Sequence, residues 1–301
     1  MASTVTDPPR GSGIAGRVSA ALFRHPRGRL GLTLAAPLAW MVLIYLVSLT
    51  LLLATSFWRL DALTSTIQRQ WGLKNYQTIV ASSTYLTITL RTLTMALAVT
   101  ATDLLLAFPI AYYAARMATP RMRALIALLV VLPLWANYLI RVFAWKTLLS
   151  GGGPVDALLE AIGLGSVSIA GTRWAVWLTF TYLWLPFAIL PIYAALERVP
   201  PSFLEASSDL GARTAVTFRT VVFPLAVPGI AAGSIFTFSL TLGDYLTPTL
   251  VGKDLFLGNA ISSLTGTANN KPLAAAIAVI PIVIVVIYLS LAKRTGAFEA
   301  L

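Results

Sequence analysis

The chain has 301 residues, of which 57% are hydrophobic and only 11% are charged, whereas a soluble globular chain carries about 25% charged residues. This composition excludes an ordinary soluble protein and predicts one membrane domain. The net charge of +11 does not indicate nucleic-acid binding, because most Lys and Arg lie in short segments between apolar runs, where they set membrane orientation. The chain has no Cys and a single His, His25, so disulfides are excluded and a metal or haem site lacks its usual ligands.

Six long apolar runs follow one another along the chain. A helix that crosses a hydrocarbon core of roughly 30 Å needs about 20 mostly apolar residues. The runs lie at about 30–57, 86–115, 124–148, 174–196, 227–250 and 272–292. The sequence therefore predicts an all-α, multi-pass membrane protein with about six transmembrane helices. We expect the membrane domain to occupy residues 30–292, between tails at 1–29 and 293–301.

The start of the chain and its loops predict an orientation. The run at 30–57 is far longer than the apolar core of a cleavable signal peptide, so we expect a retained span. Before it, the apolar residues of 14–22 share one helical face, and this stretch is either a helix on the membrane surface or a disordered tail. Lys and Arg are more frequent in the loops on the side of the N-terminus, which predicts that both termini are cytoplasmic. On the opposite side, a turn signal at 151–154 leads into a short amphipathic helix expected at 155–162.

The loop between the fourth and fifth runs, about 198–226, is much longer than a tight helical turn. Pro200 and Pro201 end the fourth span, and Ser202 is expected to cap a new helix at 202–210. Gly211 suits the left-handed turn that ends such a helix.

A second helix is expected from Thr214 to a kink at Pro224. The product is an elbow of two helices joined at a glycine, on the predicted cytoplasmic side. Its apolar residues Phe203, Leu204 and Leu210 have little reason to be exposed unless another protein covers them. The alternative is an ordinary amphipathic surface helix between two spans.

The elbow carries a recognisable motif. Glu205-Ala206-Ser207, followed by Gly211, Val221 and Pro224, resembles the Glu-Ala-Ala … Gly … Ile-x-Leu-Pro loop of binding-protein-dependent ABC importer permeases. Ser207, Val221 and Phe223 stand where the family has Ala, Ile and Leu, and the spacing from Glu to Gly to Pro is kept.

This resemblance implies the type I, MetI-like architecture, in which a cytoplasmic coupling helix docks on an ATPase subunit. It assigns that coupling role to Glu205, Ala206, Ser207, Asp209, Leu210 and Gly211. It also implies three kinds of partner: a dimer of ATP-binding subunits, a second permease that is usually a different homologous chain, and an external substrate-binding protein. The implied location is the bacterial inner membrane.

Three further segments narrow the resemblance to permeases of the spermidine/putrescine type. They are 132–142 in the third run, 185–193 in the fourth and 243–248 in the fifth. The resemblance implies a small cationic solute such as a polyamine. Relatives carry other small charged solutes, which remain the alternative.

Ionisable residues inside apolar runs must face protein or water, because charge is costly in lipid. Asp244 and Arg141 lie at a similar depth if their helices are straight. Asp244 is then either a ligand for a cationic solute or the partner of Arg141 in an ion pair that joins two helices. Asp103 lies deeper, either on the path or held at a helix contact.

Aromatic residues gather in the same runs. A polyamine ammonium can lie against such rings by cation–π attraction, and the alternative for most of them is packing within the bundle or at the membrane interface. The candidates for the substrate path are Asp244, Tyr245, Asp103, Trp135, Tyr138, Tyr182 and Trp184.

The chain carries no Gly-x-x-x-x-Gly-Lys phosphate loop, so we expect ATP and Mg²⁺ on a partner chain and no catalytic residue or bound cofactor here. An ion-coupled secondary transporter is one alternative, but it gives no reason for the elbow. A membrane enzyme is another, but the acidic residues are scattered along the chain.

Overall fold

The computed structural model describes residues 34–293, apart from 36, 62–63, 164 and 166–168. The expected amphipathic stretch at 14–22 lies outside the described residues. The chain divides into two compact units, Met1–Thr55 and Ser56–Leu301. The helix Pro37–Ser56 is long and apolar enough to span a membrane, and it includes the π-helical turn η1 (Val42–Leu46) and α3 (Val47–Ser56).

The second unit contains the other candidate spans. They are α5 (Ser83–Arg116), α9 (Arg173–Glu197), the helical stretch Thr214–Gly243 and α15 (Lys271–Ala292). The helices α6 (Pro120–Trp135) and α7 (Tyr138–Leu148) also qualify when taken as one broken span. The described part of the chain thus has five unbroken candidate spans, or six with the broken one, as the hydropathy predicts.

Short elements connect the spans. A hairpin of β1 (Arg59–Leu60) and β2 (Ile67–Gln68) precedes α4 (Lys74–Ala81). The helix α8 (Pro154–Ala161) confirms the helix expected after the turn signal at 151–154. Between the last two spans lie α13 (Leu246–Val251) and α14 (Leu257–Thr265).

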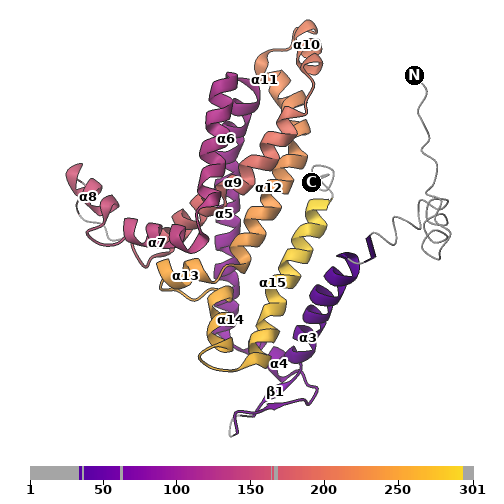
Figure 1. Ribbon diagram of the computed structural model, residues 1–301, viewed down its shortest axis with the longest axis vertical. Coiled ribbons are helices and arrows are strands. Elements are labelled where there is room, and N and C mark those ends of the chain that lie inside the picture. The colour runs from indigo at the N-terminus through magenta and orange to yellow at the C-terminus, as the bar shows by residue number, and fades with distance from the viewer. Residues whose placement is uncertain (1–33, 36, 62–63, 164, 166–168, 294–301) are drawn as a thin grey trace, which may run out of the picture. The chain divides into compact units, whose positions relative to one another are not determined.

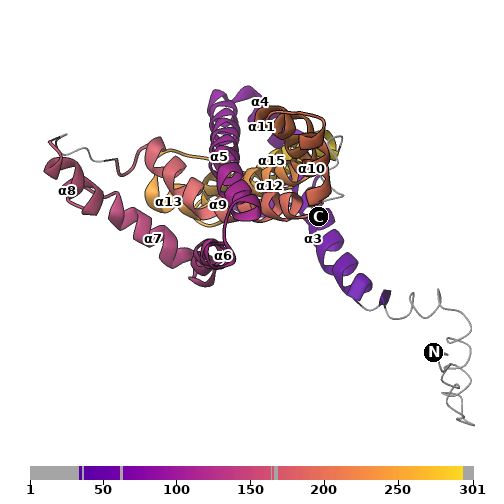
Figure 2. The ribbon, with the colours of Figure 1, turned by 90° about the horizontal axis from the view of Figure 1, so that it is seen from above.

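The third apolar run is not one straight helix. The axes of α6 and α7 differ by 98°. Pro133 lies in the last turn of α6 and has no N–H to continue the helical ladder. Ala136 has extended backbone, Asn137 is not helical either, and the Asn137 side chain accepts the N–H of Leu139 to cap α7. The hydrogen bonds of a new helix therefore begin here, and α7 and α8 lead away from α6 (Figure 1, Figure 2).

The fifth apolar run also ends earlier than its hydropathy predicts. The helix α12 (Phe223–Gly243) stops at Gly243, and Asp244 has extended backbone. The carboxylate of Asp244 accepts the N–H groups of Leu246 at 2.8 Å and Thr247 at 3.3 Å. It thus satisfies free donors at the start of α13, as a capping side chain does.

Three helices, α5, α9 and α12, pack closely to form the centre of the second unit. Glycine allows the closest approach. A Cβ atom on Gly229 of α12 would lie 2.5 Å from the Cβ of Ala195 and 2.6 Å from the carbonyl oxygen of Pro191. A Cβ on Gly233 would lie 3.1 Å from the backbone of Ala188. Small residues at helix contacts are how membrane helices gain packing energy without a hydrophobic driving force.

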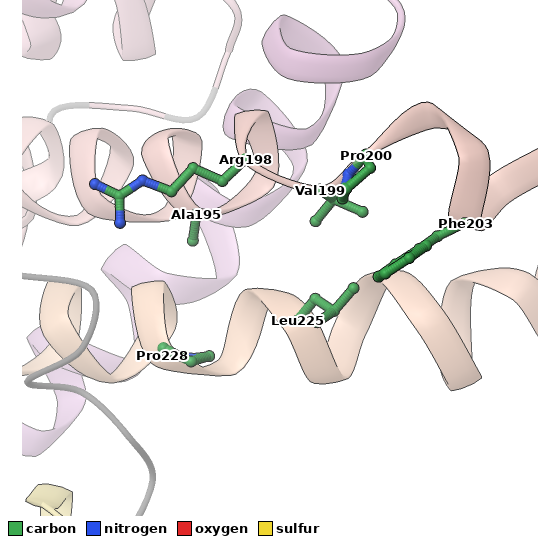
Figure 3. Close-up of a pocket in the computed structure, with 7 residues that line it drawn as sticks. All are labelled: Ala195, Arg198, Val199, Pro200, Phe203, Leu225 and Pro228. Atoms are coloured by element: carbon green, nitrogen blue, oxygen red, sulfur yellow. The ribbon is translucent and has the colours of Figure 1, made fainter.

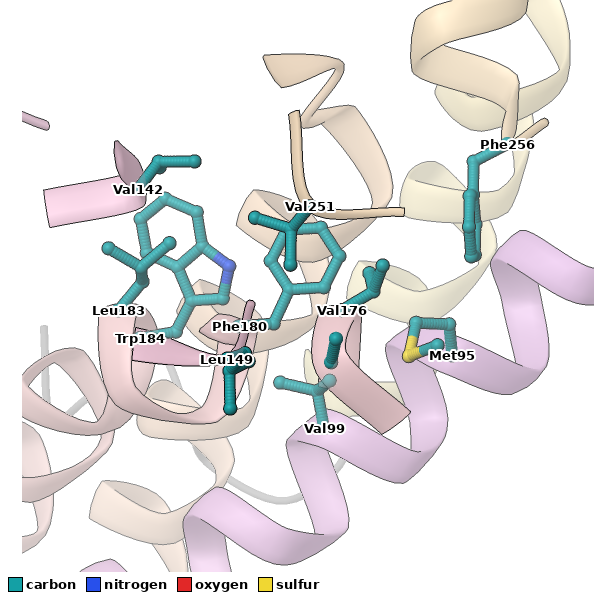
Figure 4. Close-up of a cluster of buried hydrophobic side chains, with 11 residues drawn as sticks. Met95, Val99, Val142, Leu149, Val176, Phe180, Leu183, Trp184, Val251 and Phe256 are labelled. Atoms are coloured by element: carbon teal, nitrogen blue, oxygen red, sulfur yellow. The ribbon is translucent and has the colours of Figure 1, made fainter. Parts of the chain in front are cut away.

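A cluster of buried apolar side chains attaches the bent helix α7 to this centre (Figure 4). Val142 of α7 is fully buried and belongs to one cluster with Leu183 and Trp184 of α9 and Val99 of α5. Val251, at the end of α13, belongs to the same cluster. The cluster thus holds both short helices, α7 and α13, beside α9, and it determines where their polar residues meet.

Candidate functional site

The elbow begins where the sequence predicts, but its cap differs. The helix α10 (Pro201–Asp209) starts at Pro201, and Pro200 is the N-cap without a side-chain hydrogen bond. The expectation that Ser202 caps the helix is therefore wrong. Proline suits the first helical position because its ring fixes φ and the N–H that it lacks has no helical partner there.

The turn after α10 depends on Gly211. Its φ of +75° confirms the expected left-handed conformation. The N–H of Gly211 donates to the carbonyl of Ser208 at 2.8 Å, and the N–H of Ala212 donates to the carbonyl of Ser207 at 3.1 Å. These bonds close the C-terminus of α10. A Cβ on Gly211 would meet no atom within 4 Å, so the demand for glycine comes from the backbone and not from crowding.

The second arm of the elbow is α11 (Thr214–Thr217), which continues through the π-helical turn η2 (Phe218–Val222) into α12. The hydroxyls of Ser207 and Thr217 hydrogen-bond at 2.8 Å and tie the two arms together. Thr217 was not among the candidate residues, because only the fold brings it opposite Ser207.

One face of the elbow is hollow and apolar. A cavity of about 580 Å³ opens between α10 and the start of α12. Its lining is Phe203, Ala206, Ser207, Leu210, Ala212, Thr220, Val221, Pro224 and Leu225. Leu210 is 87% exposed and Phe203 is 50% exposed, whereas Leu204 packs inside the protein against the cluster that contains Val222. The prediction of an exposed apolar surface is therefore right for Phe203 and Leu210 and wrong for Leu204.

Phe203 lines two cavities. It also lines a smaller cavity of about 230 Å³ with Pro200, Leu225 and Pro228, where its ring points toward Leu225 of α12 (Figure 3). The charged candidates Glu205 and Asp209 are exposed on α10. The elbow therefore combines an exposed apolar surface with two exposed acidic residues on the same helix.

A second site lies at the far end of α12, where α7, α9 and α13 meet. A cavity of about 380 Å³ is lined by Tyr138, Trp184, Ser239, Leu240, Gly243, Asp244, Tyr245 and Leu246. The structure thus brings together Tyr138, Trp184, Asp244 and Tyr245, which are four of the candidates for the substrate path. The rings of Tyr138 and Trp184 are stacked, with their centroids 5.9 Å apart.

The carboxylate of Asp244 is half-buried and well supplied with donors. Tyr138 donates its hydroxyl to Oδ2, and Thr247 donates to the same oxygen at 2.7 Å. The backbone N–H groups of Leu246 and Thr247 occupy Oδ1. A carboxylate has about four acceptor positions, so all of them are taken. The hydroxyls of Tyr138 and Thr247 also lie 2.8 Å apart, so the Thr247 oxygen is an alternative acceptor for the Tyr138 proton.

Arg141 and Asp244 do not form the ion pair that was one of the two interpretations of Asp244. Among the described residues, no salt bridge joins them. Arg141 instead lies over the ring of Tyr138, with the guanidinium carbon 5.9 Å from the centroid, and its Nε and Nη1 atoms are buried without a hydrogen-bond partner in the described structure. The shared depth assumed straight helices, whereas α7 bends away from α6 and α12 ends before Asp244.

The remaining candidates are not among the described residues that line this cavity. Trp135 is 85% exposed at the end of α6. Tyr182 contacts Trp145, with ring centroids 5.3 Å apart. Asp103 is fully buried in α5, and neither of its carboxylate oxygens has a hydrogen-bond partner in the described structure. In the same part of the chain, no three His, Asp or Glu side chains gather as a metal site would require.

Comparison with known proteins identifies relatives along the whole chain. Residues 99–295 match the family described as binding-protein-dependent transport system inner membrane component. The chain is 44% identical to the inner membrane ABC transporter permease protein YdcU of Escherichia coli (strain K12), over 100% of both chains. It is 33% identical to the spermidine/putrescine transport system permease protein PotB of Haemophilus influenzae, over 82% of this chain and 87% of the relative.

The fold has a counterpart among solved structures. A chain of a bacterial alginate ABC transporter, in complex with a periplasmic protein bound to an alginate pentasaccharide, superposes with a TM-score of 0.71. The match covers 93% of this chain and 98% of the other at 18% identity. At that identity the likeness shows the fold alone.

Proposed function

This chain belongs to the family of binding-protein-dependent transport system inner membrane components, and from that membership we propose that it forms half of the path of an ATP-driven polyamine importer. The observation that carries the choice of solute is the cavity at the end of α12, where the Asp244 carboxylate lies among Tyr138, Trp184 and Tyr245. A carboxylate with aromatic faces suits an organic ammonium, through charge and cation–π attraction. The named function of PotB supports the same class of solute.

The filled acceptor positions of Asp244 suggest how a solute would enter. An ammonium group would take the place of the Tyr138 hydroxyl at Oδ2, and Tyr138 would turn its proton to the oxygen of Thr247, 2.8 Å away. The exchange leaves no buried hydroxyl unpaired, so it avoids the cost of an unsatisfied polar group. The Tyr138 hydroxyl would therefore donate to Asp244 only while no cation is bound.

We propose that the elbow couples this cavity to an ATPase. The exposed apolar surface of Phe203 and Leu210 would enter a groove on the ATP-binding subunit, with Glu205 and Asp209 at its edge. The partner subunits would bind ATP and Mg²⁺, and a second permease would complete the path. An external binding protein would deliver the solute. Alternating access then follows from rigid-body movement, without covalent chemistry in this chain.

An uptake experiment tests the proposal directly. The chain, its ATP-binding subunit, the second permease and the binding protein are reconstituted in liposomes, and radiolabelled spermidine, putrescine and methionine are compared. We expect ATP-dependent accumulation of a polyamine and none of methionine. Accumulation driven by an ion gradient without ATP would contradict the importer, and transport of another charged solute in place of polyamines would contradict the choice of solute.

We also propose that both termini face the cytoplasm, since Lys and Arg are more frequent in the loops on that side. Because the chain has no Cys, single cysteines report accessibility without background. Glu160→Cys in α8 and Ser208→Cys in α10 replace exposed residues. A membrane-impermeant maleimide added to intact cells should label position 160 and leave position 208 unlabelled until the membrane is opened. The reverse pattern would show the opposite orientation.

A further inference from the structure

Three charged residues form a cluster at the end of the spans remote from the elbow. Asp254, in the loop after α13, lies 3.5 Å from Nη1 of Arg91 on α5 and 2.5 Å from Nε of Arg173 at the start of α9. Arg91 also donates to the carbonyl of Leu255 at 2.9 Å. The cluster thus joins α5 and α9 through one carboxylate.

The cluster carries one uncompensated positive charge. The hydrogen bond from Arg173, together with the positive charge of Arg91, lowers the pKa of Asp254, so this carboxylate is ionised at neutral pH. One anion therefore faces two guanidinium groups. The Arg91 side chain is 18% exposed, while that of Arg173 is 62% exposed. Because Arg173 is the more exposed of the two arginines, a ligand can reach the excess positive charge there.

An apolar groove begins at this charge. One cavity of about 310 Å³ is lined by Thr87, Leu90, Arg91, Thr94, Met95 and Arg173. A second, of about 620 Å³, is lined by Thr94, Met95, Ala98, Thr102, Arg173, Trp174 and Trp177. They share Thr94, Met95 and Arg173, so they form one continuous groove between α5 and α9. From Thr94 to Thr102 the groove follows α5 for about 12 Å toward the membrane centre, at 1.5 Å per residue.

We propose that this groove binds one anionic phospholipid. The phosphate lies on the guanidinium of Arg173, whose free Nη donors match phosphate oxygens. One acyl chain follows Met95 and Ala98, and the 68% exposed Trp174 lies at the headgroup level, where tryptophan concentrates in membrane proteins.

Charge complementarity decides between lipid classes. A phosphodiester without a headgroup amine carries one negative charge, which balances the single excess charge of the cluster. A zwitterionic lipid with the same chains fills the groove equally well but brings its own cation to Arg173. Basic pockets between membrane helices recognise anionic headgroups for this reason.

The test compares lipids that differ only in headgroup. The complete importer complex is purified with phosphatidylglycerol or with phosphatidylcholine of identical acyl chains, and the retained lipid is measured by native mass spectrometry. We expect at least fivefold preference for phosphatidylglycerol, lost in Arg173→Gln. Arg59→Gln removes an exposed arginine outside the groove and should keep the preference. Equal retention of the two lipids by the unchanged complex would overturn the proposal.

A second variant separates electrostatics from damage to the fold. Asp254→Asn removes the ion pair with Arg173, as Arg173→Gln does, and also the ion pair with Arg91, but it raises the positive charge of the groove. We expect it to increase retention of phosphatidylglycerol, and a decrease would overturn the proposal. A photo-crosslinker at Ala98 should label lipid, while labelling of the second permease would show a protein occupant and would equally overturn it.

Discussion

Replacing Gly211 with Val is expected to lower ATP-driven uptake at least tenfold. A left-handed conformation costs a non-glycine residue about 1–2 kcal/mol, and Val has a branched side chain that fits it poorly. The turn would relax and redirect α10, which moves Leu210 away from its partner. The measurement is uptake in reconstituted liposomes, together with the amount of ATPase that co-purifies with the permease.

A control variant and a second elbow variant show whether this result is specific to the elbow. Gly72→Val introduces the same side chain where φ is not positive and no atom lies within 4 Å of the new Cβ, so it should leave uptake unchanged. Leu210→Glu changes an 87% exposed residue and leaves the turn intact. It should also release the ATPase. Solute binding by the external receptor should be normal throughout, and normal uptake in both Gly211→Val and Leu210→Glu would refute the coupling role.

Asp244→Asn is expected to reduce the efficiency of uptake by about 10- to 150-fold. A hydrogen bond to a charged group contributes about 1.5–3 kcal/mol, and tenfold corresponds to about 1.4 kcal/mol. Asparagine retains the shape of the side chain but removes the charge that would hold a cationic solute. Ser239→Ala, in the same cavity, removes a hydroxyl without changing charge and should have a small effect. The readout is the concentration dependence of polyamine uptake.

The variant Tyr138→Phe distinguishes two roles of Asp244, as a ligand for the solute or only as a cap of α13. It frees one acceptor position on Asp244 and keeps the ring that stacks on Trp184. If the cation displaces the Tyr138 hydroxyl, the variant should bind polyamine more tightly than the unchanged protein and lower the concentration for half-maximal uptake. If Asp244 only caps α13, the variant should lower thermal stability without changing the concentration for half-maximal uptake, and that outcome would exclude the ligand role.

The double variant Asp244→Asn with Arg141→Gln tests the remaining link between these residues. Because no direct ion pair joins them, the double variant should be no more stable than the less stable of the two single variants. A complex more stable than either single variant would instead show that the two charges pair in another state of the transporter.

The features that the sequence predicted correctly depend on neighbours along the chain. Hydropathy is a property of each segment, so the spans were recognisable without the fold. The left-handed turn at Gly211 likewise depends on residues within one turn of it. The elbow was therefore predictable almost to the residue, with two exceptions. Ser202 is not the cap because the helix starts one residue earlier, and the burial of Leu204 depends on which face of α10 packs inward.

The features that could not be predicted from the sequence depend on contacts between distant segments. Pro133 indicated a kink, but the 98° bend places α7 where Val142 can enter the cluster beside Leu183 and Trp184. Hydropathy is continuous across that break and gives no sign of the angle. Asp254 meets Arg91 and Arg173 from a loop far along the chain, and no local pattern marks it as their partner. The same limitation applied to Arg141, whose contact with Tyr138 depends on the direction of α7.

The glycine contact between α9 and α12 has a mechanical consequence. With Gly229 and Gly233 against the backbone of α9, the two helices cannot slide past each other without steric overlap, so the pair behaves as a stiff lever arm. The elbow lies at one end of α12, and the Asp244 cavity lies at the other, about 30 Å away at 1.5 Å per residue. A tilt of about 5° at the elbow would displace the far end by about 3 Å over that length. Such a displacement is as large as a hydrogen bond is long, and it is enough to break or make the contact between the Asp244 carboxylate and Tyr138 of α7.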